Sequence, residues 1–262
     1  MKIPPVSRPT RNVRPPALPM VATSLFLALA GCSSTVETTD PTPAASDDLP
    51  GGHVHGLSAD AESGEILLAT HEGLFDVSTE PARKIGPDFD MMGFAAADDA
   101  EVFYASGHPA AGQPGPDPVG LLRSNDGGET WETLSRQGES DFHALTSTKS
   151  GVVGFDGALR TSEDGLTWNI VEVPFGPFSL AADPTTNTLL ATTESGPQRS
   201  VDGGNKWGPL AGAPVIQWAA FAGPQDVFGV SPDGEILLHV ATTEGLLTSI
   251  DEGKTFEASA DV

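Results

Sequence analysis

The segment Arg123-Ser-Asn-Asp126-Gly-Gly-Glu-Thr-Trp131 decides the fold, because three further segments repeat its pattern. The other copies are Arg160-Thr-Ser-Glu-Asp164-Gly-Leu-Thr-Trp168, Arg199-Ser-Val-Asp202-Gly-Gly-Asn-Lys-Trp207 and Thr248-Ser-Ile-Asp251-Glu-Gly-Lys-Thr-Phe256. The first three aspartates are 38 residues apart, and the last follows the third by 49 residues. A recurrence of this period predicts stacked supersecondary units rather than one irregular fold.

The residue types in each copy indicate a structural turn. An aspartate accepts hydrogen bonds from backbone N–H groups just ahead of it, and glycine supplies the positive φ that a tight turn demands. The aromatic residue five positions later begins the next strand and is able to pack between neighbouring units. We therefore expect these aspartates and aromatics to stabilise the fold and not to catalyse a reaction.

Short apolar runs between the turns predict an all-β chain. The run Gly64-Glu-Ile-Leu-Leu-Ala-Thr-His-Glu-Gly73 returns as Gly234-Glu-Ile-Leu-Leu-His-Val-Ala-Thr-Thr-Glu-Gly245, and no long stretch follows the 3.6-residue period of a helix. A ring of blades is preferred over an open sandwich because radial repetition protects strand edges. We expect a β-propeller with blades at 53–86, 87–134, 135–173 and 174–210 and an irregular tail at 211–262, giving five blades, or six with one truncated.

The four repeats resemble the Asp-box (S-x-D-x-G-x-T-W), also called the BNR repeat, of sialidases, sortilin-type receptors and related propellers. The short segments His53-Val-His-Gly56, Met92-Gly-Phe94, Ser106-Gly-His-Pro109 and Asp141-Phe-His-Ala144 also look like an actinobacterial lipoprotein family grouped as glycosyl hydrolase-like. The resemblance implies a propeller in which the Asp-box joins the outer two strands of each blade, away from the ligand face. Fold alone does not fix a function.

The first residues predict export and lipid anchoring. A basic leader precedes the apolar run Met20–Ala30, which ends in Leu29-Ala-Gly-Cys32. This order is typical of a signal peptide, and its end resembles a bacterial lipobox in which Cys32 is diacylated. Cys32 is the only cysteine, so no disulfide framework explains it. We expect a signal peptide at 1–31, an acylated cysteine and flexible linker at 32–52, and the propeller at 53–262, held on the extracytoplasmic side of a bacterial cell membrane.

The chain is strongly acidic, with 13 Lys and Arg against 36 Asp and Glu and a net charge of −23. Removal of the leader takes four cations with it and leaves 9 against 36, a net charge of −27. Such a surface repels nucleic acid, because phosphate binding needs clustered Lys and Arg. It is compatible with cations and with neutral ligands, and acidity also keeps a surface protein soluble.

Five of the six histidines are expected at one end of the propeller axis, because they fall where inner strands begin or second strands end. The longest loop, 109–118, is expected over the same face, and such loops often carry function. Imidazole and thioether donors suit a transition metal, either copper or zinc. Strand-end histidines that cap turns, or a histidine-lined pocket for an organic ligand, are the alternatives. The candidate metal ligands are His53, His55, His71, Met92, His108 and His143.

The sequence leaves enzyme activity open. Sialidases, by the resemblance, use three arginines, a tyrosine–glutamate pair and an aspartic acid/base, but here three of the five arginines after the leader precede the repeats, and Tyr104 is the sole tyrosine. Hydrolysis of neutral glycans needs only two suitably spaced carboxylates. Five are expected near the axial mouth: Asp141, Asp156, Glu72, Glu194 and Glu244. Two functions therefore remain open. One is a surface module that binds a metal ion, another ligand or a protein partner, and the other is a glycosyl hydrolase acting on extracellular glycans.

Overall fold

The computed structural model describes residues 50–60, 63–210, 213 and 215–221, together with the backbone of strands between 227 and 258. The predicted signal peptide at 1–31, Cys32 and most of the predicted linker at 32–52 lie outside these residues, as do Glu244, Asp251 and Phe256. In the described part of the chain, no helix is long and apolar enough to cross a membrane.

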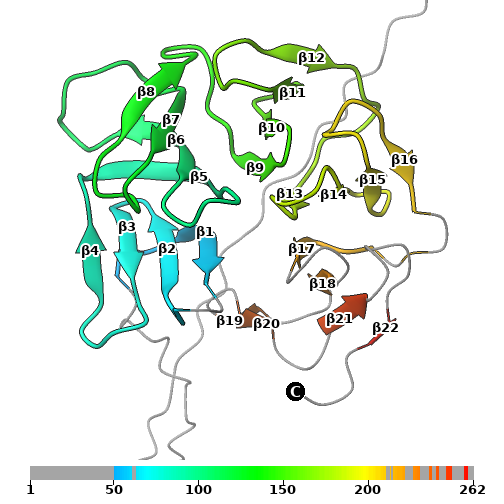
Figure 1. Ribbon diagram of the computed structural model, residues 1–262, viewed down its shortest axis with the longest axis horizontal. Coiled ribbons are helices and arrows are strands. Elements are labelled where there is room, and N and C mark those ends of the chain that lie inside the picture. The colour runs from blue at the N-terminus through cyan, green and yellow to red at the C-terminus, as the bar shows by residue number, and fades with distance from the viewer. Residues whose placement is uncertain are drawn as a thin grey trace, which may run out of the picture. The chain divides into compact units, whose positions relative to one another are not determined.

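The chain forms consecutive four-stranded antiparallel sheets whose strands follow one another in sequence order (Figure 1). The first sheet contains β1 (Val54–Ala59), β2 (Ile66–Thr70), β3 (Gly73–Asp76) and β4 (Arg83–Ile85). The second contains β5 (Phe89–Ala96), β6 (Phe103–Pro109), β7 (Leu121–Ser124) and β8 (Glu132–Ser135). The third contains β9 (Ala144–Thr148), β10 (Gly151–Phe155), β11 (Leu159–Ser162) and β12 (Asn169–Val171). The fourth contains β13 (Ser179–Ala182), β14 (Leu189–Thr192), β15 (Gln198–Ser200) and β16 (Gly208–Pro209).

Four blades are thus complete among residues described with their side chains, which is fewer than the five or six expected. The rest of the chain contributes backbone strands that pair in the order β17-β18-β21-β22, and a separate two-stranded pair β19-β20. These strands are β17 (Trp218–Phe221), β18 (Val227–Val230), β19 (Ile236–Leu237), β20 (Val240–Ala241), β21 (Leu246–Ser249) and β22 (Glu257–Ala258). The expected irregular tail at 211–262 coincides with the part of the chain that is only partly described.

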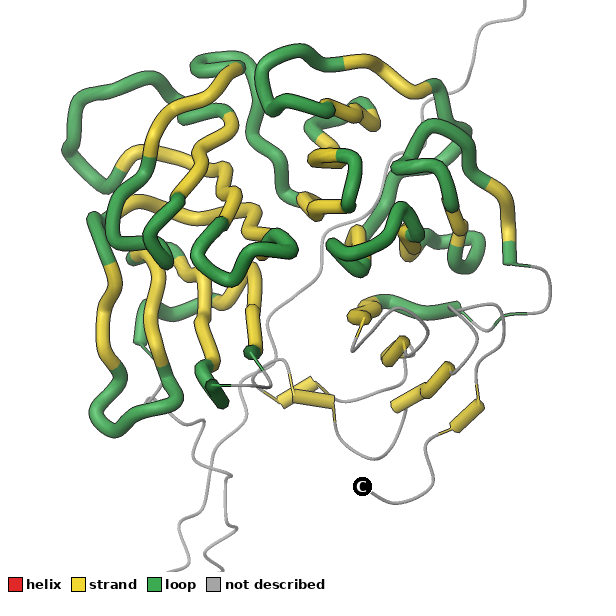
Figure 2. Tube along the Cα trace, in the orientation of Figure 1, coloured by secondary structure: helices red, strands yellow, loops and turns green. Residues whose placement is uncertain are grey.

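The first strands of successive sheets contact one another, β1 with β5, β5 with β9, β9 with β13 and β13 with β17. Residues from all five of these strands surround one cavity of about 400 Å³. The inner strands therefore lie around a common axis, with the later strands of each sheet farther out (Figure 2). This is the arrangement of a β-propeller.

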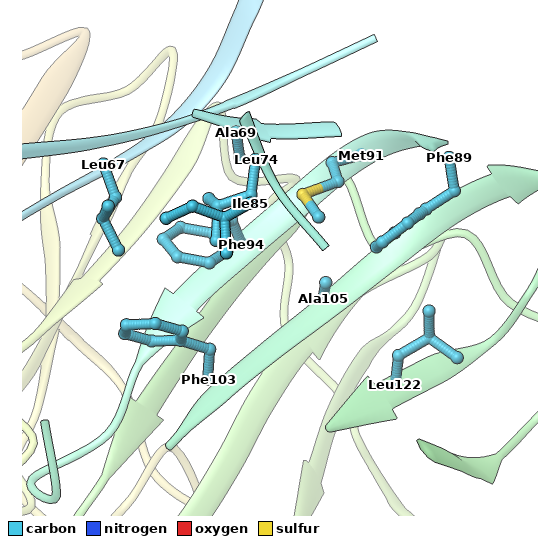
Figure 3. Packing of buried hydrophobic residues seen from close by; sticks show 10 residues of the cluster. All are labelled: Leu67, Ala69, Leu74, Ile85, Phe89, Met91, Phe94, Phe103, Ala105 and Leu122. Carbon is cyan, nitrogen blue, oxygen red and sulfur yellow. The ribbon is translucent and has the colours of Figure 1, made fainter. Parts of the chain in front are cut away.

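The apolar cores lie between blades. In Figure 3, Leu67, Ala69 and Leu74 of the first blade face Met91 and Phe94 of the second. The predicted aromatics complete these interfaces: Trp131 packs on the core between the first two blades, Trp168 on the core between the second and third, and Trp207 on the core between the third and fourth. The expectation that these residues pack between units is confirmed for the three tryptophans.

The aspartate turns join the third and fourth strands of their blades, as expected. Asp126 Oδ1 accepts a hydrogen bond from the Thr130 N–H at 2.9 Å, and Asp164 and Asp202 accept equivalent bonds from backbone N–H groups ahead of them. The sequence reasoning included the serine two residues before each aspartate in the repeat pattern but gave it no structural role. Ser124 Oγ donates to Asp126 and accepts from the Gly128 N–H at 2.8 Å. The same serine recurs at 162 and 200, where it also bonds the following aspartate, so its repetition was a readable signal.

Candidate functional site

The antiparallel strand order places two kinds of structure at opposite ends of the axis. The first strand of each blade begins, and its second strand ends, at one end, while the aspartate turns lie at the other. His53, His55, His71, His108 and His143 all fall at the first end, which we call the histidine face. His55 lies in β1, His71 directly follows β2, His108 lies near the end of β6, and His143 directly precedes β9. These placements agree with the expectation that the histidines share one face.

Two of these histidines form a close pair, which we call the His55–His71 pair. Their Nε2 atoms are 3.1 Å apart, and their rings meet edge to face with centroids separated by 4.4 Å. The other ring nitrogen of His71, Nδ1, lies 2.7 Å from Asp90 Oδ1. His53 is exposed, with its ring centroid 5.7 Å from that of His71.

The contacts of this pair determine where its protons reside. A carboxylate only accepts hydrogen bonds, so Asp90 holds the proton of neutral His71 on Nδ1 and leaves a lone pair on Nε2. The pKa of His55 is lowered, first by burial and then by repulsion from His71, although Asp90 opposes the shift. Burial and the neighbouring His71 both favour the neutral form of His55. The neutral imidazole is the form that binds metal ions.

The remaining histidines form a second group around Asp141. His108 Nε2 lies 3.2 Å from Asp141 Oδ2, and His143 Nδ1 lies 3.3 Å from the same oxygen. His108 Nδ1 lies 2.5 Å from Asp117 Oδ1, at the far end of the long loop. Carboxylates contact both ring nitrogens of His108. The pKa of His108 is raised chiefly by the hydrogen bond to Asp117 and further by the charge of Asp141, against the effect of burial.

Two β-bulges place equivalent positions of neighbouring blades on this face. The register of β1 shifts between Val54 and Gly56, at His55, and that of β5 shifts between Met91 and Gly93, at Met92. Bulges re-aim side chains and are frequent near functional sites. Met92 is half-buried at this position. His55 and Met92 therefore lie at equivalent bulge positions of consecutive blades.

The structure thus divides the six proposed metal ligands into groups rather than one cluster. His55 and His71 come together, His108 and His143 meet at Asp141, and no described set of three or more His, Cys, Asp or Glu side chains has the arrangement of a metal centre.

The sequence reasoning missed Asp90 and Asp117. Asp90 had a readable signal, because it precedes Met92 by two residues just as Asp141 precedes His143. Asp117 had none, since only the folded loop brings it to His108.

Among the carboxylates considered for glycan hydrolysis, Asp156 is held in an ion-pair network. Its oxygens accept hydrogen bonds at 2.9 Å from Arg160 Nε, and Arg136 lies 3.5 Å away. These contacts give Asp156 a structural role. Asp141 is shared between two histidines, whereas Glu72 and Glu194 are exposed.

The cavity on the axis lies at the other end of the inner strands. Its wall contains Leu57, Phe94 and Leu145 along with the carboxyl-bearing residues Asp60, Glu65 and Asp98. It contains none of the five histidines of the histidine face. The cavity and the histidine face are therefore separate features of the same axis.

The sequence matches no protein-family model and no curated protein. Among solved structures, it is similar to the GH74 enzyme of Niastella koreensis, with a TM-score of 0.54 and 16% identity over 79% of this chain and 37% of that one. It is also similar to a chain of a nidogen/laminin complex, with a TM-score of 0.56 and 10% identity over 78% of each chain. An ancestral GH74 enzyme gives a TM-score of 0.47 and 15% identity over 76% of this chain.

This chain spans 29% and 37% of the lengths of the two GH74 structures. The structures with TM-scores of 0.54 and 0.56 show the fold alone and leave the activity open, because they are only 16% and 10% identical to this chain. Together with the sheet order and the shared axis of the inner strands, they show that this chain is an all-β protein with the β-propeller fold.

Proposed function

We propose that this protein is a metal-binding propeller that holds a transition-metal ion, copper or zinc, on its histidine face through His55 and His71. The observation that carries the proposal is the 3.1 Å separation of the two Nε2 atoms. For metal–nitrogen bonds of about 2.0–2.1 Å, two ligand atoms at adjacent positions are separated by about 2.9 to 3.4 Å. The pair therefore has the spacing of two ligands of one ion.

Asp90 supplies the second feature of such a site. Metal-bound histidines commonly donate their other N–H to a carboxylate, which fixes the tautomer and the ring orientation. The contact between His71 Nδ1 and Asp90 Oδ1 has this form, and Asp90 comes from the neighbouring blade. The strong negative charge of the chain further favours cations.

We also propose a cellular location for the protein. Diacylation of Cys32 would hold the propeller on the outer side of a bacterial cell membrane through two acyl chains, which suffice for durable anchoring. The four repeats are Asp-boxes in this interpretation, and they stabilise the blades. Phase partition in a temperature-sensitive detergent tests the anchor: the protein should enter the detergent phase, and the Cys32→Ala variant should stay in the aqueous phase.

Calorimetric titration tests metal binding. The full chain, purified in detergent, is titrated with Cu²⁺ and with Zn²⁺, and we expect saturable binding of one ion per chain. His55→Ala and His71→Ala should each abolish the saturable phase. Asp98→Asn, which removes an exposed charge at the opposite end of the axis, should retain it, because binding requires imidazoles and not merely acidity.

Thermal unfolding of each variant shows whether the fold survives the substitution. Two results would overturn the proposal: absence of saturable binding in the parent, or parent-like binding in both folded histidine variants. Binding that is lost in His143→Ala and kept in His55→Ala would move the ion to Asp141 and would also contradict it.

A glycosyl hydrolase is the second candidate. The observation that favours it is Asp141, a carboxylate at the mouth with only 18% of its side chain exposed and a buried Oδ1 atom that has no hydrogen-bond partner. Chromogenic glycosides provide the test. Turnover that disappears in Asp141→Asn supports an enzyme. Absence of turnover of both neutral and acidic glycosides supports a binding module for a metal ion, a glycan or a protein partner.

A further inference from the structure

We propose that the His55–His71 pair recognises a metal ion that arrives already bound to another chelating group, so that the natural ligand is a metal complex rather than the bare ion. This inference rests on the proposed metal-binding function. It adds the chemical class of the ligand: a neutral or cationic complex of copper or nickel type with two adjacent positions open to imidazole.

The spacing of the His55–His71 pair supports binding of a metal complex. Two nitrogen donors 3.1 Å apart fill two adjacent positions around one ion. Square-planar and octahedral ions with bonds of about 2.0–2.1 Å place adjacent ligands about 2.9 Å apart, close to the observed spacing. A pair of imidazoles therefore matches a complex in which a second molecule occupies the other positions.

The His55–His71 pair is also accessible from solvent. The side chain of His71 is 41% exposed, and His55 is half-buried beneath it in the bulge of β1. The neighbouring His53 is exposed as well. Because His53 and His71 are exposed, we infer that an ion held by the two Nε2 atoms would be accessible to a chelating molecule from solvent.

The carboxylates of the histidine face favour a cationic complex. Asp90 contacts His71, and Asp117 and Asp141 lie on the same face around His108. Among the described side chains, the basic groups in contact with these carboxylates are the histidines His71, His108 and His143. A face with this composition attracts a positively charged complex and repels an anionic one.

The binding step balances without a change in oxidation state. Two water molecules leave the complex as the two Nε2 lone pairs take their positions. His71 already carries its proton on Nδ1 beside Asp90. In the free protein His55 Nε2–H donates a hydrogen bond to the lone pair of His71 Nε2 at 3.1 Å. On binding this hydrogen bond breaks and the His55 proton moves through solvent to Nδ1, so no net proton is released.

Two copper complexes and one nickel complex of stated geometry test the inference on the full chain in detergent. Copper(II)–ethylenediamine is cationic and has two adjacent open positions, so we expect it to bind one per chain. Copper(II)–cyclam has the same charge but its equatorial positions are filled, so it should not bind. Nickel(II)–nitrilotriacetate has two adjacent open positions and a negative charge, so it should bind more weakly than the cationic complex.

Electron paramagnetic resonance provides the decisive readout for the ethylenediamine complex. The bound copper should show four equatorial nitrogens, two from ethylenediamine and two from the protein. Either His55→Ala or His71→Ala should weaken binding by about a hundredfold, as expected when one arm of a two-armed contact is removed. The Asp98→Asn control should bind as the parent does.

The outcomes separate this inference from the proposed function. If bare Cu²⁺ binds through His55 and His71 but the ethylenediamine complex does not, metal binding stands and recognition of a complex is wrong. If neither binds, both are wrong. Equal binding of the cyclam complex would show attraction by charge alone and would also overturn the inference.

Discussion

Asp90 Oδ1, on the first strand of the second blade, lies 2.7 Å from His71 Nδ1 at the end of the second strand of the first blade. The contact crosses from one repeat to the next, so the orientation of the His71 ring depends on how two blades are stacked. The propeller therefore does more than display histidines at one end: it sets which nitrogen of His71 faces His55.

Removing the charge of Asp90 tests this dependence. We expect Asp90→Asn to weaken metal binding by about 10- to 100-fold, the usual effect of losing a carboxylate behind a metal-bound histidine. Titration calorimetry measures the change. Asp88→Asn is the matched control, because Asp88 is two residues away, 71% exposed and paired with Lys84. Equal weakening in both variants would attribute the effect to general charge.

The contacts of His108 with Asp117 and Asp141 lead to a prediction about the ionisation of His108. Asp117 and Asp141 raise the pKa of His108, so its ring protons should titrate in NMR spectra above the ordinary histidine value of about 6.5. Asp117→Asn should lower this pKa because it removes the largest cause of the shift. An unchanged titration curve in that variant would show that the loop aspartate does not contact His108 in solution.

The same shift makes a signed prediction for stability. A group whose pKa is higher in the folded state stabilises the fold below its unfolded pKa, and this contribution is lost as the pH rises through the folded value. The stability difference between the parent and Asp117→Asn should therefore be largest at mildly acidic pH and shrink toward alkaline pH. Thermal unfolding across this range measures it.

Asp156 predicts the opposite pH dependence. Its pKa is lowered because, although burial acts to raise it, hydrogen bonds from Ser140 and Arg160 and the charge of Arg160 outweigh burial. Its stabilising contribution is complete above the ordinary carboxyl pKa of about 3.9 and is lost as the pH falls through the lower folded value. We expect Asp156→Asn to be less stable than the parent at neutral pH, by on the order of 3 kcal/mol, and to lose less stability on acidification. Parallel curves of melting temperature against pH would contradict this.

The interface between the second and third blades depends on Phe142. This side chain is fully buried and stacks on Trp168, with ring centroids 4.8 Å apart. Phe142→Ala should lower the free energy of unfolding by about 3–5 kcal/mol. Phe178→Ala is the control, because Phe178 directly precedes β13 as Phe142 leads into β9 but is 52% exposed. Chemical denaturation should show a large change for the first variant and a small one for the second.

The repeats made much of the fold predictable from sequence. The spacing of Asp126, Asp164 and Asp202 marks three blades, and each turn forms between the third and fourth strands because local hydrogen bonds close it. Alternating strand direction then requires the histidines to gather at the other end, and they do. These inferences succeed because they depend on order along the chain and not on side-chain orientation.

The candidate site was less predictable, since it depends on contacts between repeats. Sequence spacing treats His55 and His143 as equivalent positions, yet His55 turns to His71 in its own blade while His143 turns to Asp141. The bulges that aim His55 and Met92 and the loop that returns Asp117 to His108 leave no periodic trace. The six candidate metal ligands therefore fall into separate groups, which their sequence positions alone do not predict.

The central claim is that one ion lies between His55 and His71. Crystals of the copper- or zinc-loaded protein, measured at the absorption edge of the metal, test it most directly. We expect one anomalous peak on the histidine face, about 2.0–2.1 Å from both Nε2 atoms, with Asp90 still hydrogen-bonded to His71. A peak at Asp141 between His108 and His143, or a metal-loaded protein with no peak on this face, would contradict it.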